Sequence, residues 1–484
     1  MSTTTNRRPM TAPSAAPPAV PPVPSRERPR TEFELRGRAR RRRGAVDLLG
    51  VVAWASAAAA VTLWLCSGPV DLSGFGQVLV AAGIVSGMIG TDLILVMLVL
   101  AARIPFIDHL VGHDAAMVQH GKLGKPALYL LLAHAALLIG GYAAESNANL
   151  IAETVALWNT ADVLLSFLGL FALVAVVWTS IVAVRKVLPY EVWHGIHLLS
   201  YVAVGIAIPH QLSEGQVLAQ GSWERVYWVA LYVVALGSIA VFRFAVPMVR
   251  SLRHRVVVDR VEQIAADVVS VHLRGRALTR LNARGGQFFM WRFWTRTTWW
   301  HAHPISLSAV PTDEGMRITV RALGRGTAQL GSLRPGTPVS FAGPYGVFTD
   351  QARTSTRVAV AASGIGITPV RAFLERLDAP AGAVTILLRG RSPRDPFLWQ
   401  EVIDWAHQHG HRVFTSIGSR GNGVSGWLSV ADTARGASAA SVFPDLSRSD
   451  FYICGPGRWS DLVEQDALRA GLPVAQLHRE RFDW

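Results

Sequence analysis

The strongest constraint on this chain is a series of six long apolar stretches in its first half. They lie near residues 45–66, 76–101, 117–142, 161–184, 192–210 and 226–247. Each is long enough to cross a bilayer, because a helix needs roughly 20 apolar residues to span the hydrocarbon core. Backbone polar groups in lipid must pair within their own segment, so these stretches are expected to form a bundle of membrane-spanning helices.

Lysine and arginine are distributed unevenly between the loops that join these stretches. The loops near 67–75 and 143–160 carry none, and the loop near 211–225 carries only Arg225. The opposite side carries the basic run of residues 36–43 and further basic residues. Because basic loops stay in the cytoplasm, both termini are expected to be cytoplasmic, in a plasma membrane of bacterial type.

The formal net charge of +14 raises the question of a nucleic-acid partner. A basic run beside a membrane span more often sets its orientation or contacts anionic lipid, so no nucleic-acid partner is expected. Residues 1–43 are basic and rich in Pro, and are expected to be a disordered tail. Cys66 and Cys454, the two cysteines, fall on opposite sides of the membrane, which excludes a disulfide and a cysteine metal site.

Two of the apolar stretches carry a histidine near each end. His120 and His134 are 14 residues apart, which places them about 40° from one helix face and roughly 21 Å apart along the axis. His197 and His210 are 13 residues apart, about 140° off one face, so Pro209 must kink or unwind the helix to re-aim His210. Ionisable side chains in a membrane are costly and histidine is a common haem ligand, so the pairs predict two b-type haems.

The expected topology puts His120 and His197 near the cytoplasmic leaflet, and His134 and His210 near the outer leaflet. His194 is an alternative to His197, since it also lies near the inner end of its stretch. Taken singly, each histidine has the alternative of being a buried polar residue with a local partner. Two matched pairs within two spans favour bis-histidine ligation of two stacked metal centres.

After about residue 250 the composition changes. Short alternating runs near 255–261, 268–273, 287–291 and 317–323 are separated by Gly, Pro and polar turns, a pattern typical of a small antiparallel barrel. From about residue 357 the pattern becomes strand–helix. Strands near 358–363, 384–388 and 451–454, with a helix at 370–377, predict a parallel α/β sheet.

Several short motifs lie at the ends of these strands. The turn from Ser363 to Pro369 reads Ser-Gly-Ile-Gly-Ile-Thr-Pro and joins a strand to a helix. Its glycines would let the backbone approach a pyrophosphate at the helix N-terminus, and Pro369 suits a first helical position. A tight turn without a ligand is the alternative, because the last glycine of the dinucleotide fingerprint is absent. The other motifs are His303-Pro-Ile-Ser306 in a barrel strand, Gly326-Thr327 opening a short helix, and Cys454-Gly-Pro456 ending a late strand.

Together these motifs resemble the ferredoxin–NADP reductase family, in which a flavin barrel precedes a nicotinamide domain. With the six spans and paired histidines upstream, residues 44–484 resemble the NADPH oxidase and ferric reductase superfamily. The resemblance implies a multidomain fold. It consists of an all-α six-helix transmembrane bundle at 44–250, an antiparallel β-barrel FAD domain at 251–350, and an α/β parallel-sheet NAD(P)H domain at 351–484.

The resemblance also implies site residues. FAD would contact His303, Pro304, Ile305 and Ser306, with Ser306 near the reactive flavin nitrogen, and its phosphates would contact Arg321, Gly326 and Thr327. The nucleotide phosphates would contact Gly364, Gly366, Thr368 and Pro369, and the nicotinamide ring would lie near Cys454, Gly455 and Pro456. Trp484 matches the terminal aromatic that stacks on the flavin. The chain departs from the family at His303, where many relatives have Arg, and at the Gly-Arg-Trp after Pro456, where methionine is frequent.

Arg389, Arg391 and Arg394 follow the second parallel strand. Arginine beside the ribose would favour a 2′-phosphate, and therefore NADPH over NADH, unless these residues form a solvated loop. The resemblance implies an oxidoreductase that passes electrons from cytoplasmic NADPH, with FAD and two haems, to an external acceptor such as O2, giving superoxide. The alternatives are a reductase of external ferric chelates, a membrane-anchored flavin reductase serving a protein acceptor, and a histidine-lined metal transporter.

Overall fold

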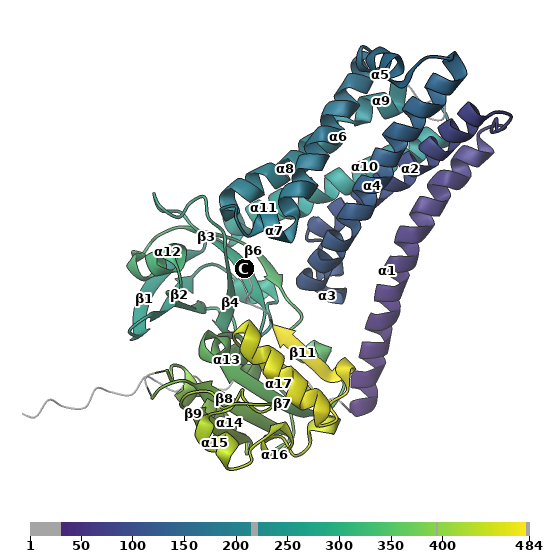
Figure 1. The fold of residues 1–484 in the computed structure, drawn as a ribbon. Helices are drawn as coiled ribbons and strands as arrows, with labels where there is room; N and C mark the ends of the chain where they lie inside the picture. Colours follow the sequence, from purple (N-terminus) through teal and green to yellow (C-terminus); the bar gives the residue numbers. More distant parts are fainter. Residues whose placement is uncertain (1–30, 214–220, 394, 481–484) are drawn as a thin grey trace, which may run out of the picture.

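The computed structural model describes residues 31–213, 221–393 and 395–480. These residues form a bundle of long helices at one end and two sheet domains at the other (Figure 1). The predicted multidomain fold is confirmed: apolar helices come first, then a sheet of antiparallel strands and a sheet of parallel strands.

Six spans long and apolar enough to cross a membrane occur in the described part of the chain, at the six predicted places. They are α1 (Glu32–Cys66), α2 (Phe75–Ala101), α4 (His113–Ser146), α6 (Ala161–Ser180), α8 (Tyr190–Ile206) with α9 (Ile208–Ser213), and α10 (Trp223–Ser238) continued by the π-helix η2 (Ile239–Ala245) and α11 (Val246–His254). The short helices α3 (Pro105–Leu110), α5 (Leu150–Trp158) and α7 (Val182–Arg185) connect them. Large apolar side chains such as Phe171, Val202 and Val233 are exposed on the outer faces, which suits a lipid surrounding.

Helix α1 begins earlier than the sequence predicted. Residues 32–43, expected to belong to a disordered tail, form its first turns. A capping box joins Thr31 and Glu34, and arginine is a good helix former, so the basic run extends the helix. These turns lie beside the domain of parallel strands (Figure 1): the Ser355 hydroxyl donates to Glu32 Oε1 at 3.5 Å. Nε of Arg42 donates to the Leu110 carbonyl at 2.7 Å.

Helices α2 and α4 approach each other closely through glycines. A Cβ atom at Gly83 would lie 2.9 Å from the Leu138 side chain, and one at Gly90 would lie 3.1 Å from Leu131. Small residues let membrane helices approach to backbone contact, where packing holds them together. This contact fixes the side chains of α4 against the backbone of α2.

The antiparallel strands form a closed barrel. They are β1 (Val257–Ala265), β2 (Val268–Arg274), β3 (Phe288–Phe293), β4 (His303–Ala309), β5 (Met316–Arg321) and β6 (Val339–Tyr345), in the order β1-β2-β5-β4-β3-β6. A bridge between Val257 and Pro338, with the Val258 N–H donating to the Thr337 carbonyl at 2.9 Å, joins the two edges. Phe289, Trp291 and Phe341 fill the interior. Strand β6 was not predicted, because Gly343 and Pro344 break its apolar pattern.

The second sheet is parallel throughout. Its strands β7 (Arg357–Ser363), β8 (Val384–Gly390), β9 (Arg412–Ile417), β10 (Ser449–Cys454) and β11 (Leu477–Glu480) lie in the order β11-β10-β7-β8-β9. The helices of this half, preceded by α12 (Arg325–Ala328) in the barrel, are α13 (Ile367–Glu375), α14 (Trp399–Gln408), α15 (Val430–Ala434), α16 (Ala439–Val442) and α17 (Gly457–Arg469). The edge strands β9 and β11 were not predicted, since both are polar and only partly buried.

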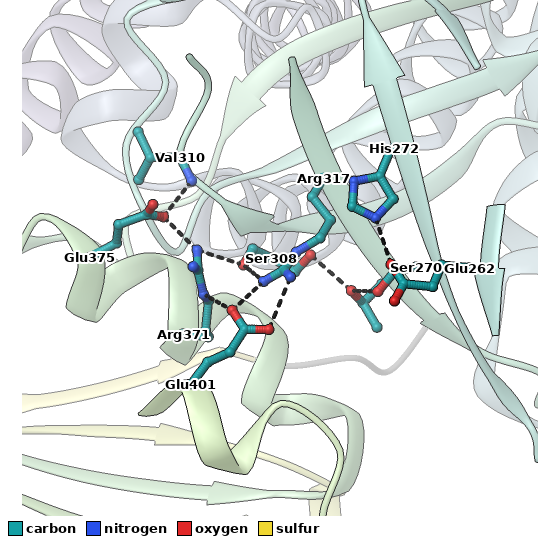
Figure 2. Close-up of polar contacts among 10 residues, drawn as sticks. Glu262, Ser270, His272, Ser308, Val310, Arg317, Arg371, Glu375 and Glu401 are labelled. Carbon is teal, nitrogen blue, oxygen red and sulfur yellow. Dashed lines mark hydrogen bonds and ion pairs between the residues drawn. The ribbon is translucent and has the colours of Figure 1, made fainter. Parts of the chain in front are cut away.

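An ion-pair network joins the barrel to the parallel-sheet domain (Figure 2). Glu401 of α14 accepts from Arg317 of β5 at 2.8 Å and from Arg371 of α13 at 2.7 Å, and Arg371 also pairs with Glu375 at 2.7 Å. Burial acts to raise the pKa of Glu401, but the hydrogen bonds and charges of Arg317 and Arg371 outweigh it and lower that pKa. The network thus fixes how the two sheet domains face each other.

Candidate cofactor sites

The inner pair of candidate haem ligands joins α4 to α8. The ring centres of His120 and His197 lie 6.0 Å apart, with the ring planes inclined by 57°. Nδ1 of His120 lies 3.1 Å from the Met97 carbonyl of α2, which orients the ring and leaves Nε2 for a ligand. Nδ1 of His197 is buried without a hydrogen-bond partner among the described residues. Trp193 contacts both histidine rings of α8, at 6.3 Å for His194 and 5.1 Å for His197. His197 is the one whose ring faces His120.

The outer pair has the same construction. Nδ1 of His134 lies 2.8 Å from the Gly83 carbonyl, and a Cβ on Gly87 would lie 2.4 Å from that Nδ1 atom, so a glycine is required there. His210 belongs to α9, which is separated from α8 by a break in the helix; this is the distortion expected from Pro209. His210 lies within electrostatic range of His134, and its Nδ1 is also buried without a hydrogen-bond partner in the described segments.

Two opposed imidazoles fit a haem iron. A metal ion about 2 Å from the nearest nitrogen of each ring would place the ring centres roughly 6 Å apart, which is the spacing of the inner pair. A ring nitrogen bonded to a backbone carbonyl is the usual support of a ligating histidine. Within the described ranges no three or more His, Cys, Asp or Glu side chains gather into a metal site; a bis-histidine iron needs only two.

In the barrel, β4 fixes the motif from His303 to Ser306 by its register with β3, pairing Ser306 with Phe288 and His303 with Trp291. His303 Nε2 and Ser306 Oγ are buried without hydrogen-bond partners among the residues described. Such an atom costs about 1–3 kcal/mol, so both fit a bound cofactor better than a filled barrel wall. Burial, with His301 adding repulsion, lowers the pKa of His303 to about 4. Between them, Pro304 pairs with Met290 and Ile305 with Phe289.

Gly326 lies against this motif, because a Cβ there would be 3.2 Å from Cε1 of His303. The hydroxyl of Thr327 accepts from the N–H groups of Leu323 at 3.1 Å and Gly324 at 3.2 Å. The structure therefore brings Gly326 to the expected flavin motif and uses the Thr327 hydroxyl to hold the turn.

Arg321 lies between the two sheet domains. Its Nε donates to Asp267 at 2.6 Å, and its Nη2 lies 3.8 Å from Asp395. Its Nη1 is 4.0 Å from a Cβ placed on Gly364. The guanidinium is thus close to the predicted pyrophosphate turn while being partly neutralised by two carboxylates.

The glycine turn and the Cys-Gly-Pro motif meet at one sheet edge. Gly364 has a φ of +56°, and a Cβ on Gly366 would lie 2.2 Å from the Cys454 carbonyl, so both positions need glycine. A Cβ on Gly455 would lie 3.1 Å from that of Ser363, and Pro456 directly precedes α17. Thr368 Oγ1 donates to the Ile365 carbonyl at 2.9 Å. Pro369 is the third residue of α13 rather than the first, still within the turn whose N–H groups lack helical partners.

Glu480 is a candidate site residue that the sequence reasoning missed. It pairs with Cys454 in the register of β10 and β11, and its Oε1 lies 3.8 Å from a Cβ placed on Gly346. Burial, with the charge of Asp114 adding, raises the pKa of Glu480 well above its usual range, and burial also raises the pKa of the Cys454 thiol. Two buried groups whose pKa values are raised therefore lie beside the expected nicotinamide position. In the sequence, the indication of this site was an acidic residue close to the C-terminal Trp484.

Asp92 of α2 was missed as well. It is 1% exposed, and its Oδ1 accepts from Ser56 of α1 at 2.6 Å. Ser56 Oγ lies 2.9 Å from the Tyr227 hydroxyl of α10. A single carboxyl group inside an apolar stretch was the signal that could have found this tie between three helices.

The basic residues expected near the ribose differ from one another. Arg389 is 2% exposed, and its guanidinium donates to the carbonyls of Trp427, Ser416, Gly418 and Gly390. It is therefore a structural residue at the end of β8, while Arg391 is exposed and is the better candidate for a 2′-phosphate. Arg394 and Trp484 lie outside the described residues.

Comparisons with known proteins divide the chain at the same place. Residues 86–208 match the family described as "Ferric reductase like transmembrane component". The ferredoxin reductase component of 3-ketosteroid-9-alpha-monooxygenase from Rhodococcus rhodochrous is 27% identical over 41% of this chain and 56% of its own length. Ferredoxin–NADP reductase B from Sorangium cellulosum is 29% identical over 33% of this chain and 68% of its own. A flavohemoprotein from Xylella fastidiosa is 25% identical over 41% of this chain and 51% of its own.

Solved structures resemble this chain only loosely. A flavohemoglobin from Malassezia yamatoensis with bound FAD and heme has a TM-score of 0.41 at 16% identity, covering 84% of this chain and 99% of that one. The FAD/NAD-binding domain of nitric oxide dioxygenase from Vibrio cholerae has a TM-score of 0.38 at 21% identity, covering 48% and 99%. The chain spans about half to two thirds of the length of the curated relatives named above.

The fold and these similarities define a class: a ferredoxin reductase-type FAD and NADP module joined to a bundle of apolar helices. Residues 86–208 of the bundle match a ferric reductase-like transmembrane component, so the combination is consistent with a fused protein of the ferric reductase and NADPH oxidase type.

Proposed function

We propose that the protein is a transmembrane oxidoreductase that takes electrons from cytoplasmic NADPH, carries FAD and two b-type haems, and delivers electrons to O2 outside the membrane, giving superoxide. The observation that supports this most is the facing of His120 and His197 across 6.0 Å within a bundle joined to a flavin-type barrel. Bound FAD would supply a two-electron acceptor for hydride, and bound haem would supply one-electron iron chemistry.

In the membrane half, His120 and His197 would hold the inner haem, and His134 and His210 the outer one. The carbonyls of Met97 and Gly83 face the Nδ1 atoms of the α4 histidines, which favours the Nδ1–H tautomer and keeps Nε2 unprotonated as a ligand. Histidines on both sides of an iron leave no open metal position, so a small acceptor would not bind to the metal.

In the reductase half, two groups would donate hydrogen bonds to the flavin. They are the hydroxyl of Ser306 and the Nε2–H of His303, both without a partner among the described residues. The open backbone at Gly364 would admit the nucleotide phosphates, with Arg321 close by as a cation, while Gly366 lets the turn pack against the Cys454 carbonyl. The buried side chains of Cys454 and Glu480 would exclude water from the nicotinamide position. Exposed Arg391 supports NADPH over NADH through the 2′-phosphate.

The uneven distribution of basic residues supports the proposed orientation. Both termini and the reductase half would lie in the cytoplasm, in a bacterial plasma membrane, and the break between α8 and α9 would lie near the outer surface. External ferric chelate is a second acceptor, favoured by the ferric reductase-like family match. A membrane-anchored reductase that serves a protein acceptor is a third candidate, favoured by the relative named as a ferredoxin reductase component.

Absorption spectra of the purified full-length protein, taken anaerobically before and after NADPH, test the proposal. We expect flavin and b-type haem bands, with reduction of the haem by NADPH only when FAD is bound. An active preparation without a Soret band would contradict the haem proposal and favour the anchored flavin reductase. Parallel assays of superoxide and ferric-chelate reduction on one sample would then separate the two small acceptors.

A further inference from the structure

A basic cavity lies where the membrane bundle meets the barrel. Its volume is about 340 Å³, and it is walled by the α2–α3 connection, α3, η2, α11, the turn before β3 and β6. None of the residues assigned above to FAD, nucleotide or haem lines it. Its lining therefore differs from the cofactor residues, although it adjoins the flavin motif, since Tyr345 pairs with Phe288 and Phe288 pairs with Ser306.

The charged groups of this cavity are all basic. Arg103, Arg250 and Arg280 line it together with His109, and no carboxylate does. Asp108, the acid that lies near Tyr345, is buried outside the lining, with its Oδ1 3.6 Å from His113 Nδ1 and no hydrogen bond to either carboxylate oxygen in the described residues. Three guanidinium groups around one small space repel each other unless an anion joins them.

Much of the donor capacity of these arginines is unused. Nε of Arg103 is buried without a hydrogen-bond partner in the described chain, although its guanidinium lies over the Tyr345 ring at 5.3 Å. Arg250 donates one bond, to the Gly343 carbonyl, out of the five that a guanidinium carries. Arg103 also has a φ of +61°, a strained backbone for arginine of the kind found at ligand sites.

The cavity lies at the ends of two of the apolar spans, α2 and the span that ends with α11. Arg103 follows directly after the end of α2, and Arg250 lies in the last turns of the sixth span. Phe242, Val246 and Pro247 give the cavity an apolar side toward the bundle. An anionic group with an apolar chain attached could therefore place its charge beside the arginines and its chain against the apolar side.

We infer that this cavity binds the phosphate group of an anionic phospholipid, with Arg103, Arg250 and Arg280 contacting the phosphate oxygens. Arginine suits phosphate because its planar fork donates two hydrogen bonds at once. Basic pockets between helices at the cytoplasmic surface are where lipid head groups bind. The bound phosphate would join the bundle to the barrel.

Native mass spectrometry of the full-length protein tests this, after extraction from phosphatidylcholine nanodiscs with and without phosphatidylglycerol. Wild type is expected to retain phosphatidylglycerol selectively. Arg280→Gln should bind it about fivefold more weakly, since one basic residue near the surface contributes about 1 kcal/mol. The Arg280 side chain is exposed, and the hydrogen bond from its backbone N–H to the Ala277 carbonyl at 3.1 Å is kept in the variant. The variant should therefore fold, and Arg280→Lys should retain most of the binding.

Arg253→Gln is the control, because Arg253 is an exposed arginine on α11, the helix that carries Arg250, and does not line the cavity. It should retain the lipid as wild type does. Equal losses in Arg280→Gln and Arg253→Gln, or no preference for phosphatidylglycerol over phosphatidylcholine, would overturn the proposal. Displacement of the retained lipid by inorganic phosphate at equal concentration would assign the cavity to a soluble phosphate and overturn the lipid.

Discussion

The membrane half and the barrel hold their candidate cofactor ligands in different ways. In the bundle, His120 and His134 each have Nδ1 within hydrogen-bond distance of a carbonyl of α2. In the barrel, His303 Nε2 and Ser306 Oγ are buried with no hydrogen-bond partner in the described residues. The α4 rings are oriented by the fold itself, whereas the barrel atoms are left to be satisfied by what binds.

This difference separates two kinds of dependence on a cofactor. Removing a histidine that the fold orients should damage the site and leave the α2 carbonyl that faced its Nδ1 atom without that hydrogen bond. Removing an unpaired buried polar atom should relieve a cost in the cofactor-free protein while weakening the bound state. Substitution by alanine is therefore expected to destabilise the cofactor-free protein in the bundle and to stabilise it in the barrel.

The largest expected effect is the loss of a haem. His134→Ala removes one of the outer ligands, so the purified protein should retain FAD and only one of the two proposed haems. His194→Ala, on the helix that carries His197, should retain both. Haem-to-flavin ratios from pyridine haemochrome and flavin absorbance measure this, and unchanged haem content in His134→Ala would show that the ligand assignment is wrong.

A smaller effect is expected from the support of the same ring. The Cβ of Gly87→Ala would lie 2.4 Å from Nδ1 of His134, so the ring must move away from the Gly83 carbonyl. Loss of such a support costs about 10–100-fold in metal affinity. Gly124→Ala is the control, because its Cβ would meet only the Met97 side chain at 3.6 Å. Haem titration of the apoprotein would measure the affinity of both variants. Equal affinities would show that the Gly83 carbonyl does not support the ligand.

In the barrel the sign should reverse. Ser306→Ala removes an unpaired buried hydroxyl, so the cofactor-free protein should gain about 1–3 kcal/mol in free energy of unfolding, while flavin binding weakens. Ser308→Ala is the control on the same strand, because its Oγ accepts from Thr319 at 2.8 Å (Figure 2). That variant should lose about 1 kcal/mol. Denaturant unfolding of the FAD-free proteins would measure these free energies. A Ser306→Ala variant less stable than wild type would contradict the contrast between the two halves.

The smallest effect is a dependence on pH. The pKa of His303 is lowered to about 4 by burial and by His301, whereas an unfolded histidine has a pKa near 6.5. Between these values the unfolded chain binds the proton and the folded chain does not, so stability falls as pH drops from about 6.5 to about 4. His303→Gln should flatten this part of the curve. Thermal unfolding of the FAD-free protein across that range would measure the difference, and parallel curves would contradict it.

Much of the membrane half could be predicted from the sequence, because apolar length and basic loops are long-range signals. The break near Pro209 was predicted for the same kind of reason, since proline cannot continue a helix ladder. The support of His134 by the Gly83 carbonyl could not be predicted, because it depends on which face of α2 meets α4. The start of α1 was missed because the polar composition of residues 32–43 concealed their helix-forming character.

In the reductase half, the motifs predicted which sheet edges matter but not what each side chain does there. The basic residues after β8 read alike in sequence, yet Arg389 is enclosed by carbonyls and Arg391 is exposed. Glu480 lies at the site because it belongs to the short edge strand β11, whose four residues are too few to be recognised as a strand from the sequence. Pairing between distant strands decided both outcomes, and a single sequence carries little information on it.

Helix α1 has 35 residues and so a length of about 50 Å, against a hydrocarbon core of about 30 Å. Its far end contacts the parallel-sheet domain through Glu32 and Ser355. A helix adapts to a thinner or thicker bilayer by tilting, and a tilt of α1 would displace that far end sideways. Hydrophobic mismatch in the host membrane is thereby linked to the position of the nucleotide-binding domain.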